Sequence, residues 1–230
     1  MRHLSYRLYN QQMPMLTKFM LHRDRTFFYI ISLTGDRAGD LGALLTDSLH
    51  WLPQREGVFF TLTKGKTIDI RNPRTVVLTH SDEAEFCAVH LLMAYLQFCS
   101  ENNIDLKHGY LFRPLNNALS GVNDKPLSSS TVNSRLKGHL QHLNIFDGET
   151  PHGTRSACAL TLTWLGVSSD EVKSHVGWKS DAMLKHYTST NAIHDKSSSV
   201  GTLSHNVLSP GVQRKIDLYK SLRCSEKVVP

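Results

Sequence analysis

Cysteines are few and no apolar run is long in this 230-residue sequence. The thiols are Cys87, Cys99, Cys158 and Cys224. They are widely spaced and form no Cys-x-x-Cys pair, which argues against a disulfide framework or a zinc site. The longest apolar stretches, residues 27–33 and 87–96, fall short of the roughly 20 residues that a membrane span requires.

A secretory signal is not visible either, because no apolar core ahead of a cleavage site follows the basic N-terminal residues. We therefore expect an intracellular protein, nuclear in a eukaryote and cytoplasmic in a prokaryote. The 13 histidines show no spacing that predicts a metal site. We expect neither a metal ion nor a cofactor.

An excess of acidic residues is also missing. Lysine and arginine number 26 against 20 acids, which gives a formal charge of +6 and a pI near 9.2. A basic balance is compatible with a nucleic-acid partner, since phosphate neutralisation and counterion release drive such binding.

The residues that are present resemble those of an ordinary folded protein, with 40% hydrophobic and 20% charged. A chain of this length can bury one sizeable core. We expect one domain over residues 1–190. Residues 191–230, with their Ser, Thr, Asn and Gly, should form a flexible C-terminal tail that includes a short basic helix at 212–222.

Apolar residues recur at helical intervals over most of the domain. Between residues 5 and 34 they predict two helices, broken near residues 23–25. Further helices are expected at residues 37–48, 82–99, 128–143, 154–165, 168–176 and from 181 onward. The helix at 128–143 should start with a Ser/Thr-rich cap, and Ser168-Ser-Asp-Glu171 has the pattern of a capping box.

Between residues 57 and 78 the sequence pattern changes from that of helices to that of β-strands. Residues 57–63 are rich in strand formers, Lys64-Gly65-Lys66 makes a turn, residues 67–70 alternate, and residues 75–78 form a further strand. The expected fold class is α+β, mainly α-helical with a small antiparallel sheet.

Three short motifs hold residues suited to chemistry on a phosphate. In the first, residues 35–41, Arg37 stands at a helix start, where its planar guanidinium and the helix N-terminus both favour an anion. Asp40 lies three residues on and could brace the guanidinium or cap its own helix. An exposed ion pair accounts for the same pattern.

The second motif is Thr150-Pro-His-Gly-Thr-Arg155. His152 and Arg155 would project from the first turn of a helix, where an imidazole can exchange protons while the guanidinium holds phosphate. A capping histidine beside a surface arginine explains the pattern equally well.

The third motif is Gly177-Trp178, followed nine residues later by Tyr187. The turn would present the indole N–H, which is a donor only, toward a phosphate oxygen. A Trp and a Tyr at helical spacing also fit packing residues of a core. We place His175 outside the set, capping its helix or facing solvent, and expect His186 to point away from the phosphate.

Taken in order, these motifs resemble the catalytic signature of the tyrosine recombinases, or phage integrases, over roughly residues 27–190. The residues concerned are Arg37, a hairpin lysine, His152, Arg155, Trp178 and Tyr187. The Gly-Trp pair is particularly similar to Cre-type enzymes, whereas many relatives have Gly-His. Crypton and DIRS-like mobile elements encode similar recombinases. The resemblance implies an integrase-like, DNA breaking-rejoining catalytic core.

The resemblance also implies a role for each residue. Arg37 and Arg155 would clamp the scissile phosphate, and Trp178 would add a hydrogen bond. Tyr187 would attack to form a 3′-phosphotyrosyl link, and His152 would assist proton movement at the nucleophile.

The general acid for the 5′ hydroxyl would be the hairpin lysine, either Lys64 or Lys66. Lys64 is favoured because it stands just before Gly65 of the turn, as the family lysine often does. The alternative for both is a solvated turn charge.

By the same resemblance, the partner would be double-stranded DNA held in a tetrameric synapse of identical subunits, and neither ATP nor metal would be needed. The family usually has a DNA-clamping domain first, for which the 36 residues ahead of Arg37 are too few. Ser156 also replaces a histidine found in many relatives. Two alternatives stay open: a domesticated DNA-binding module that does not cut, and a type IB topoisomerase.

Overall fold

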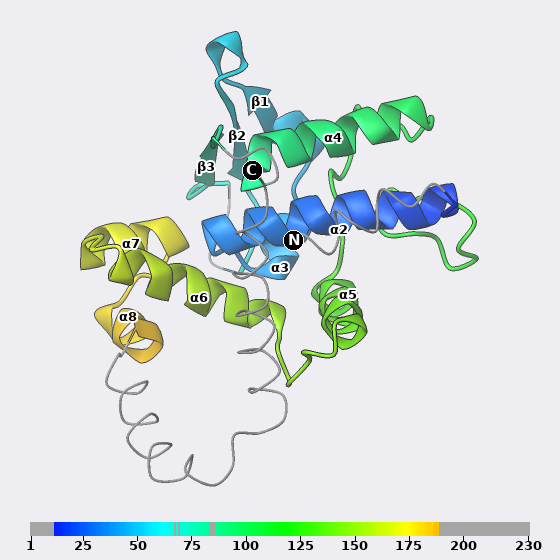
Figure 1. Ribbon diagram of the computed structural model, residues 1–230. Coiled ribbons are helices and arrows are strands. Elements are labelled where there is room, and N and C mark those ends of the chain that lie inside the picture. Colours follow the sequence, from blue (N-terminus) through cyan, green and yellow to red (C-terminus); the bar gives the residue numbers. More distant parts are fainter. Residues whose placement is uncertain (1–11, 67, 69, 83–85, 189–230) are drawn as a thin grey trace, which may run out of the picture.

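The computed structural model describes residues 12–66, 68, 70–82 and 86–188 (Figure 1). The helices are α2 (Met15–Thr34), α3 (Ala38–Gly42), α4 (Ala88–Glu101), α5 (Ser129–His142), α6 (Pro151–Trp164), α7 (Ser169–Val176) and α8 (Asp181–Thr188). The strands β1 (Leu49–Trp51), β2 (Gly57–Leu62) and β3 (Arg74–Thr79) form one antiparallel sheet in the order β1-β2-β3. The predicted fold class is confirmed.

Helix α2 runs through the middle of the molecule, with α4 and the sheet on one side and α5 and α6 on the other (Figure 1). It is continuous, so the predicted break near residues 23–25 is wrong. The guanidinium of the buried Arg23 donates to Asp24 and to the carbonyl of Arg113 at 2.8 Å, and these bonds satisfy its charge inside the protein. A charged pair therefore occupies the core without interrupting the helix.

The buried carboxylate of Asp24 also joins α2 to α5. It accepts hydrogen bonds from Arg135 Nε at 2.6 Å and from His139 Nε2 at 2.9 Å. Burial opposes the charge of Asp24, yet Arg23, His139 and Arg135 together lower its pKa below the ordinary value. One carboxylate thereby joins two helices that are far apart in the chain.

The sheet agrees with the sequence at two strands and differs at the others. Strands β2 and β3 lie where they were predicted. Residues 67–70 were predicted to be a strand, but Ile68 and Ile70, which the structure describes, lie outside any strand. Strand β1 was missed, because its three residues are too few to show an alternating pattern.

The helices after the sheet lie near their predicted positions, and caps explain two of their starts. Helix α4 starts at Ala88 rather than near residue 82, and α3 is shorter than predicted. The Ser128 hydroxyl accepts from the backbone N–H of Thr131 at the start of α5. At α7, Ser168 and Glu171 form the predicted capping box.

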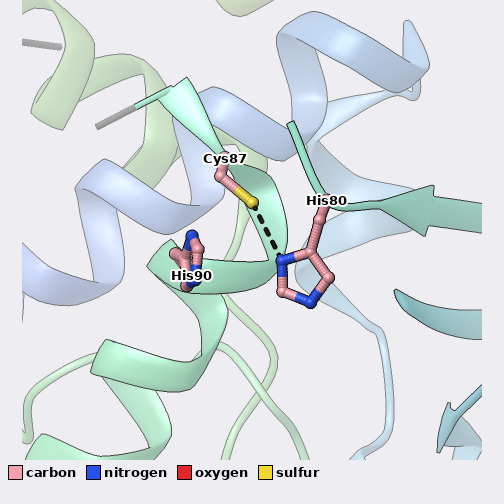
Figure 2. Close-up of side chains that lie close together, drawn as sticks. All are labelled: His80, Cys87 and His90. Atoms are coloured by element: carbon pink, nitrogen blue, oxygen red, sulfur yellow. Dashed lines mark hydrogen bonds between the residues drawn. The ribbon is translucent and has the colours of Figure 1, made fainter. Parts of the chain in front are cut away.

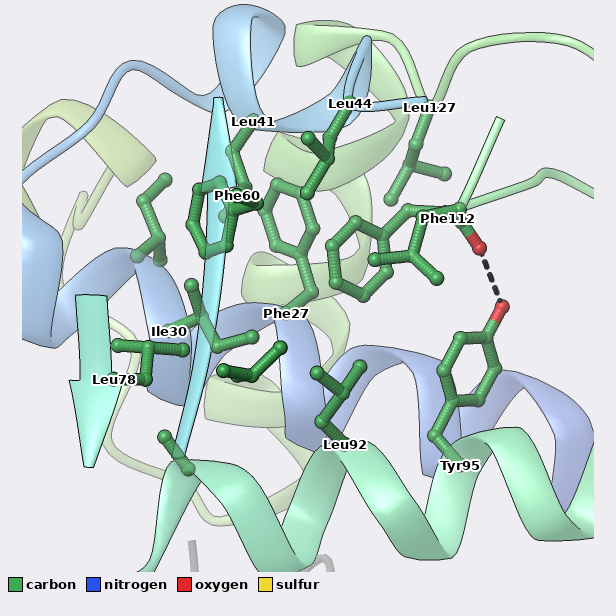
Figure 3. Close-up of a cluster of buried hydrophobic side chains, with 14 of the residues drawn as sticks. Phe27, Ile30, Leu41, Leu44, Phe60, Leu78, Leu92, Tyr95, Phe112 and Leu127 are labelled. Carbon is green, nitrogen blue, oxygen red and sulfur yellow. Dashed lines mark hydrogen bonds between the residues drawn. The ribbon is translucent and has the colours of Figure 1, made fainter. Parts of the chain in front are cut away.

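Aromatic and aliphatic side chains from α2, α3, β2 and α4 fill the main core (Figure 3). The rings of Phe27 and Phe112 meet edge to face, 5.1 Å apart. The hydroxyl of the buried Tyr95 donates to the carbonyl of Leu111 at 2.9 Å, which satisfies a polar group in this core. A second, smaller core lies between α6, α7 and α8.

The predicted tail over residues 191–230 lies outside the described residues, and so does its helix at 212–222. Within the part of the chain that the structure describes, no helix combines the length and apolarity needed to cross a membrane.

Candidate active site

The site begins where α2 ends. Gly35 terminates the helix in the left-handed conformation, with φ of 63°, and its N–H donates to the carbonyl of Ile31. A Cβ at this position would lie 2.8 Å from Val176 of α7, so both the backbone conformation and the close packing require glycine. The turn directs the chain into Arg37, which precedes α3.

Arg37 lies at the surface of the turn. Its Nη1 is 3.6 Å from Asp40 Oδ2, and the arginine side chain keeps 29% exposure. The predicted bracing by Asp40 is therefore an ion pair between residues three apart, and part of the arginine side chain faces solvent.

Arg155 is buried under the same turn. It comes from α6, is 3% exposed, and its Nη1 donates to the carbonyl of Gly35 at 2.6 Å. Burial and then the charges of Arg37 and Arg74 lower the pKa of Arg155 from 12.5 to about 10. The group remains protonated at neutral pH, but its charge is poorly solvated and favours an approaching anion.

Trp178 covers the guanidinium of Arg155, whose Cζ lies 5.5 Å from the centroid of the indole. Gly177 before it adopts φ of 67° and ends α7, which turns the indole into the small core of α6, α7 and α8. The indole Nε1 is buried and has no hydrogen-bond partner among the described residues. A buried donor without a partner is unusual and points to a ligand that completes it.

Tyr187 also stacks on this indole, with ring centroids 5.0 Å apart and an interplanar angle of 17°. Its hydroxyl lies 2.7 Å from Nε2 of His152, on the first turn of α6. Partial burial and then the charges of Arg155 and Arg37 lower the pKa of His152 below its ordinary 6.5. The imidazole is therefore neutral at pH 7, and in the tautomer with its hydrogen on Nδ1 its Nε2 can accept a hydrogen bond from the phenol.

Arg74, the first residue of β3, belongs to this site although the sequence analysis did not select it. Its Nη1 pairs with Asp36 at 2.8 Å, and its Nη2 donates to the carbonyls of Thr34 and His175. These carbonyls belong to the C-terminal ends of α2 and α7, where backbone acceptors lack helical partners. Arg74 follows Asn72-Pro73, outside the three sequence motifs, so its charge alone could have indicated that it belongs to the site.

Asp36 is the buried counterion of this arginine. Burial raises the pKa of Asp36, and the charges of Arg74 and Arg155 oppose that rise. One of its oxygens, Oδ2, has no hydrogen-bond partner among the described residues. The carboxyl therefore offsets only part of the positive charge around it.

The arginines surround a cavity of about 520 Å³. Among the described residues, five basic side chains line it against two acidic ones: Arg37, Arg74, Arg155, Lys173 and Lys179 against Asp36 and Asp40. Lys173 is already paired with Asp170 and Asp181. The positive excess makes the cavity suited to an anionic group such as a phosphate.

His152 lines a neighbouring hollow of about 300 Å³ on the α5 side. Asp36 and Arg37 border both hollows. The predicted proton-transfer residue and the predicted phosphate clamp thus lie on two sides of Arg37.

The structure does not bring the predicted lysine into the large cavity. Lys64 and Lys66 are both exposed, and neither is among the described residues that line it. Lys64 borders a small hollow of about 100 Å³ beside Asp40. A Cβ on Gly65 would lie 2.6 Å from Asp40, so the turn rests against the residue that pairs with Arg37.

The two histidines left out of the predicted set are both exposed. His175 Nε2 donates to the carbonyl of Leu33 at 2.8 Å. It therefore caps the end of α2 rather than its own helix. The ring of His186 meets that of Tyr187 edge-on, with centroids 4.8 Å apart.

A mainly helical domain with a three-stranded sheet, which gathers Arg155, His152, Trp178 and Tyr187 beside a basic cavity, has the architecture of an integrase-like catalytic core. The profile of the Phage integrase family matches residues 6–194. The chain belongs to that family. No curated protein sequence matches it.

Solved structures of recombinases share the fold. The XerH site-specific recombinase bound to difH in a pre-cleavage complex is 18% identical, with a TM-score of 0.55 over 81% of this chain and 47% of XerH. Its post-cleavage complex gives 17% identity and a TM-score of 0.56 over 86% and 50%. The XerA recombinase gives 17% and 0.53 over 91% and 64%. This chain thus spans about half the length of the XerH protein.

Proposed function

We propose that this chain is the catalytic domain of a site-specific DNA recombinase or integrase, which cleaves and rejoins strands through a covalent bond between DNA and Tyr187. Membership of the phage integrase family supports the reaction class. The observation that carries the residue assignment is the 2.7 Å contact between the Tyr187 hydroxyl and a histidine of lowered pKa, beside the buried Arg155.

In the proposed cleavage step, the phenolic oxygen of Tyr187 attacks the phosphorus and its proton passes to Nε2 of His152. A bond forms between that oxygen and phosphorus, and the bond between phosphorus and the 5′ oxygen breaks. The result is a 3′-phosphotyrosyl link and a free 5′ hydroxyl. Attack by a 5′ hydroxyl reverses the step, so the strand is resealed without ATP or a metal ion.

The negative charge that develops on the phosphate oxygens would be stabilised by three groups. Arg37 approaches from the exposed turn and Arg155 from the buried side, and both keep their charge through the reaction. The indole N–H of Trp178, which no group of the described residues accepts, would supply a third donor. Because these groups are already in place, little reorganisation is needed when the charge appears.

Lys64 is our candidate for the acid that protonates the leaving 5′ oxygen. Its turn packs against Asp40 at the edge of the cavity, although its side chain is exposed. Lys66 occupies the other side of the same glycine and is the alternative. Closure of the turn over bound DNA would deliver either ammonium group.

The proposed partner is double-stranded DNA, held by a tetramer of this protein in the synapse, with no small molecule or membrane involved. The XerH structures are complexes with a difH substrate, before and after cleavage. Action on DNA would place the protein in the nucleus of a eukaryote or the cytoplasm of a prokaryote. The catalytic domain is proposed to cover residues 1–190.

A suicide substrate tests the function directly. The full chain is mixed with a randomised pool of nicked duplexes, because groove contacts and DNA shape set the target. Strands that remain attached to the protein in detergent are sequenced. We expect an adduct with the wild type and with Tyr110→Phe, and none with Tyr187→Phe.

Other outcomes distinguish the alternatives. DNA binding without an adduct in any pool would contradict cleavage and support a domesticated binding module. Adduct formation with relaxation of supercoiled plasmid, but no exchange between duplexes, would favour a topoisomerase. An adduct that persists in Tyr187→Phe would show that another residue is the nucleophile.

A further inference from the structure

Three side chains with metal-binding atoms meet at the junction of β3 and α4, away from the basic cavity. His80 follows the end of β3, Cys87 precedes α4, and His90 lies in its first turn (Figure 2). One ligand atom of each lies within 4.8 Å of the others. We propose that these three residues bind a Zn²⁺ ion.

The orientation of His80 is the first argument for this site. Its Nε2 lies 3.0 Å from the carbonyl of Arg55, which can only accept, so Nε2 carries the hydrogen. In the neutral ring Nδ1 then presents its lone pair, and Nδ1 lies 3.5 Å from the sulfur of Cys87 (Figure 2). A zinc-bound histidine is commonly held in this way, with its second nitrogen donating to a carbonyl.

The environment of Cys87 is the second argument. Its side chain is buried, and its sulfur faces the lone pair of His80 Nδ1 at 3.5 Å. The sulfur also stands at the N-terminus of the 14-residue α4, where a negative charge is favoured. Zinc binds the thiolate, so the thiol proton is released when the ion binds.

The spacing suits zinc. Tetrahedral bonds of about 2.0 Å to nitrogen and about 2.3 Å to sulfur place those two ligands about 3.5 Å apart. The distance between His80 and Cys87 has this value already. The rings of His80 and His90 are 4.9 Å apart, and both residues are exposed, so side-chain rotation can bring the second nitrogen onto the ion. Water would fill the fourth position.

Two imidazoles and one thiolate favour zinc over magnesium or calcium, which prefer oxygen ligands. The ion would join the end of β3 to the start of α4, and α4 packs along α2. None of the three residues is among the described residues that line the basic cavity. The site is therefore structural, and it does not depend on the proposed cleavage chemistry.

A cobalt titration tests the site in the full chain, purified without a polyhistidine tag and stripped with a chelator. One equivalent of Co²⁺ should give a thiolate-to-cobalt charge-transfer band, which Zn²⁺ then displaces. Cys87→Ser should abolish the band. His80→Ala and His90→Ala should each weaken metal binding by about tenfold or more, as loss of a metal ligand or its support does.

Two matched controls retain the site. His108→Ala removes another exposed histidine, and Cys99→Ala removes another buried cysteine of α4. Both should bind cobalt like the wild type, and zinc should raise the melting temperature of both more than that of His90→Ala. The proposal is wrong if the wild type gives no thiolate band, or if His80→Ala and His90→Ala bind as tightly as His108→Ala.

Discussion

The hydroxyl of Tyr187 and Nε2 of His152 lie 2.7 Å apart, although 35 positions separate the two residues in the chain. Each belongs to a different helix, α8 and α6, and the indole of Trp178 stacks on the tyrosine ring. A phenol is a weak nucleophile at neutral pH, so a neutral base at this distance is what its activation needs.

This contact predicts how cleavage depends on pH. The pKa of His152 is lowered from 6.5, so the ring is neutral at pH 7 and accepts the phenolic proton. As the pH falls through that lowered pKa, the ring becomes protonated and loses its function as a base. We expect the rate of adduct formation to fall only below pH 6.5 in the wild type. A His152→Asn variant should be slower and lack this acid limb; the same limb in both proteins would exclude His152 as the base.

The phosphate clamp predicts a large effect of Arg37→Ala. The Arg37 side chain is 29% exposed and lies at the surface of the turn, so the fold should survive the change. Cleavage should slow by about a hundredfold or more, the usual result of removing one preorganised charge stabiliser. Single-turnover adduct formation measures it, with the exposed Arg71→Ala as the matched control. A rate near that of the control would show that Arg37 is not part of the clamp.

The indole N–H of Trp178 has no partner among the described residues, which predicts different cleavage rates for two Trp178 variants. Trp178→Phe keeps an aromatic ring beside Arg155 and Tyr187 but removes the donor, which should slow cleavage by about tenfold or more, as loss of a hydrogen bond to a charged group does. Trp178→His restores a donor and should recover part of the rate. Melting temperatures of both variants control for packing. Equal rates for Phe and His at this position would mean that the N–H is not used.

The hairpin lysines predict a dependence on the leaving group. If Lys64 protonates the 5′ oxygen, Lys64→Ala should slow cleavage of ordinary DNA far more than cleavage of DNA with a 5′-bridging sulfur, because a thiolate leaves without an acid. Lys66→Ala serves as the comparison. If Lys64→Ala cleaves both substrates equally slowly, Lys64 is not the acid. If the 5′-bridging sulfur restores cleavage only in Lys66→Ala, Lys66 is the acid instead.

The buried Asp24 predicts a stability effect apart from the site. Asp24→Asn leaves the charge of Arg23 without its counterion, which should reduce the free energy of unfolding by about 3–5 kcal/mol. Because the pKa of Asp24 is lowered from 3.8, the charged carboxylate stabilises the fold above that pH, and this stability is lost as the pH falls below it. Denaturant unfolding at several pH values measures both effects. If the wild type and Asp24→Asn lose the same amount of stability on acidification, the charge of Asp24 does not stabilise the fold.

Local patterns were sufficient for much of the fold. The Ser168 and Glu171 capping box and the cap at Ser128 depend on neighbours within a few residues, and strands β2 and β3 coincide with local runs of strand-forming residues. All were predicted correctly. The errors fell where distant contacts override local preference. The charges at Arg23 and Asp24 suggested a break, but partners far along the chain, Arg113 and His139, allow α2 to continue.

The residues of the candidate site could also be predicted only in part from the sequence. Arg37, His152, Arg155, Trp178 and Tyr187 were selected by their order and spacing. The structure places Tyr187 against both His152 and Trp178, and Trp178 against Arg155. Their chemical roles stay predictions until the variants are measured. Lys64 was also selected, and the structure leaves it exposed outside the cavity.

The sequence by itself determined the family signature, the helix caps and the basic charge, because these are properties of residue type and short spacing. Only the tertiary structure decided that Arg74 enters the site, that the indole N–H of Trp178 has no partner among the described residues, and that His80 meets Cys87 and His90. Burial, pKa and unmet hydrogen bonds arise from what surrounds a group in space, and most of those neighbours are remote along the chain.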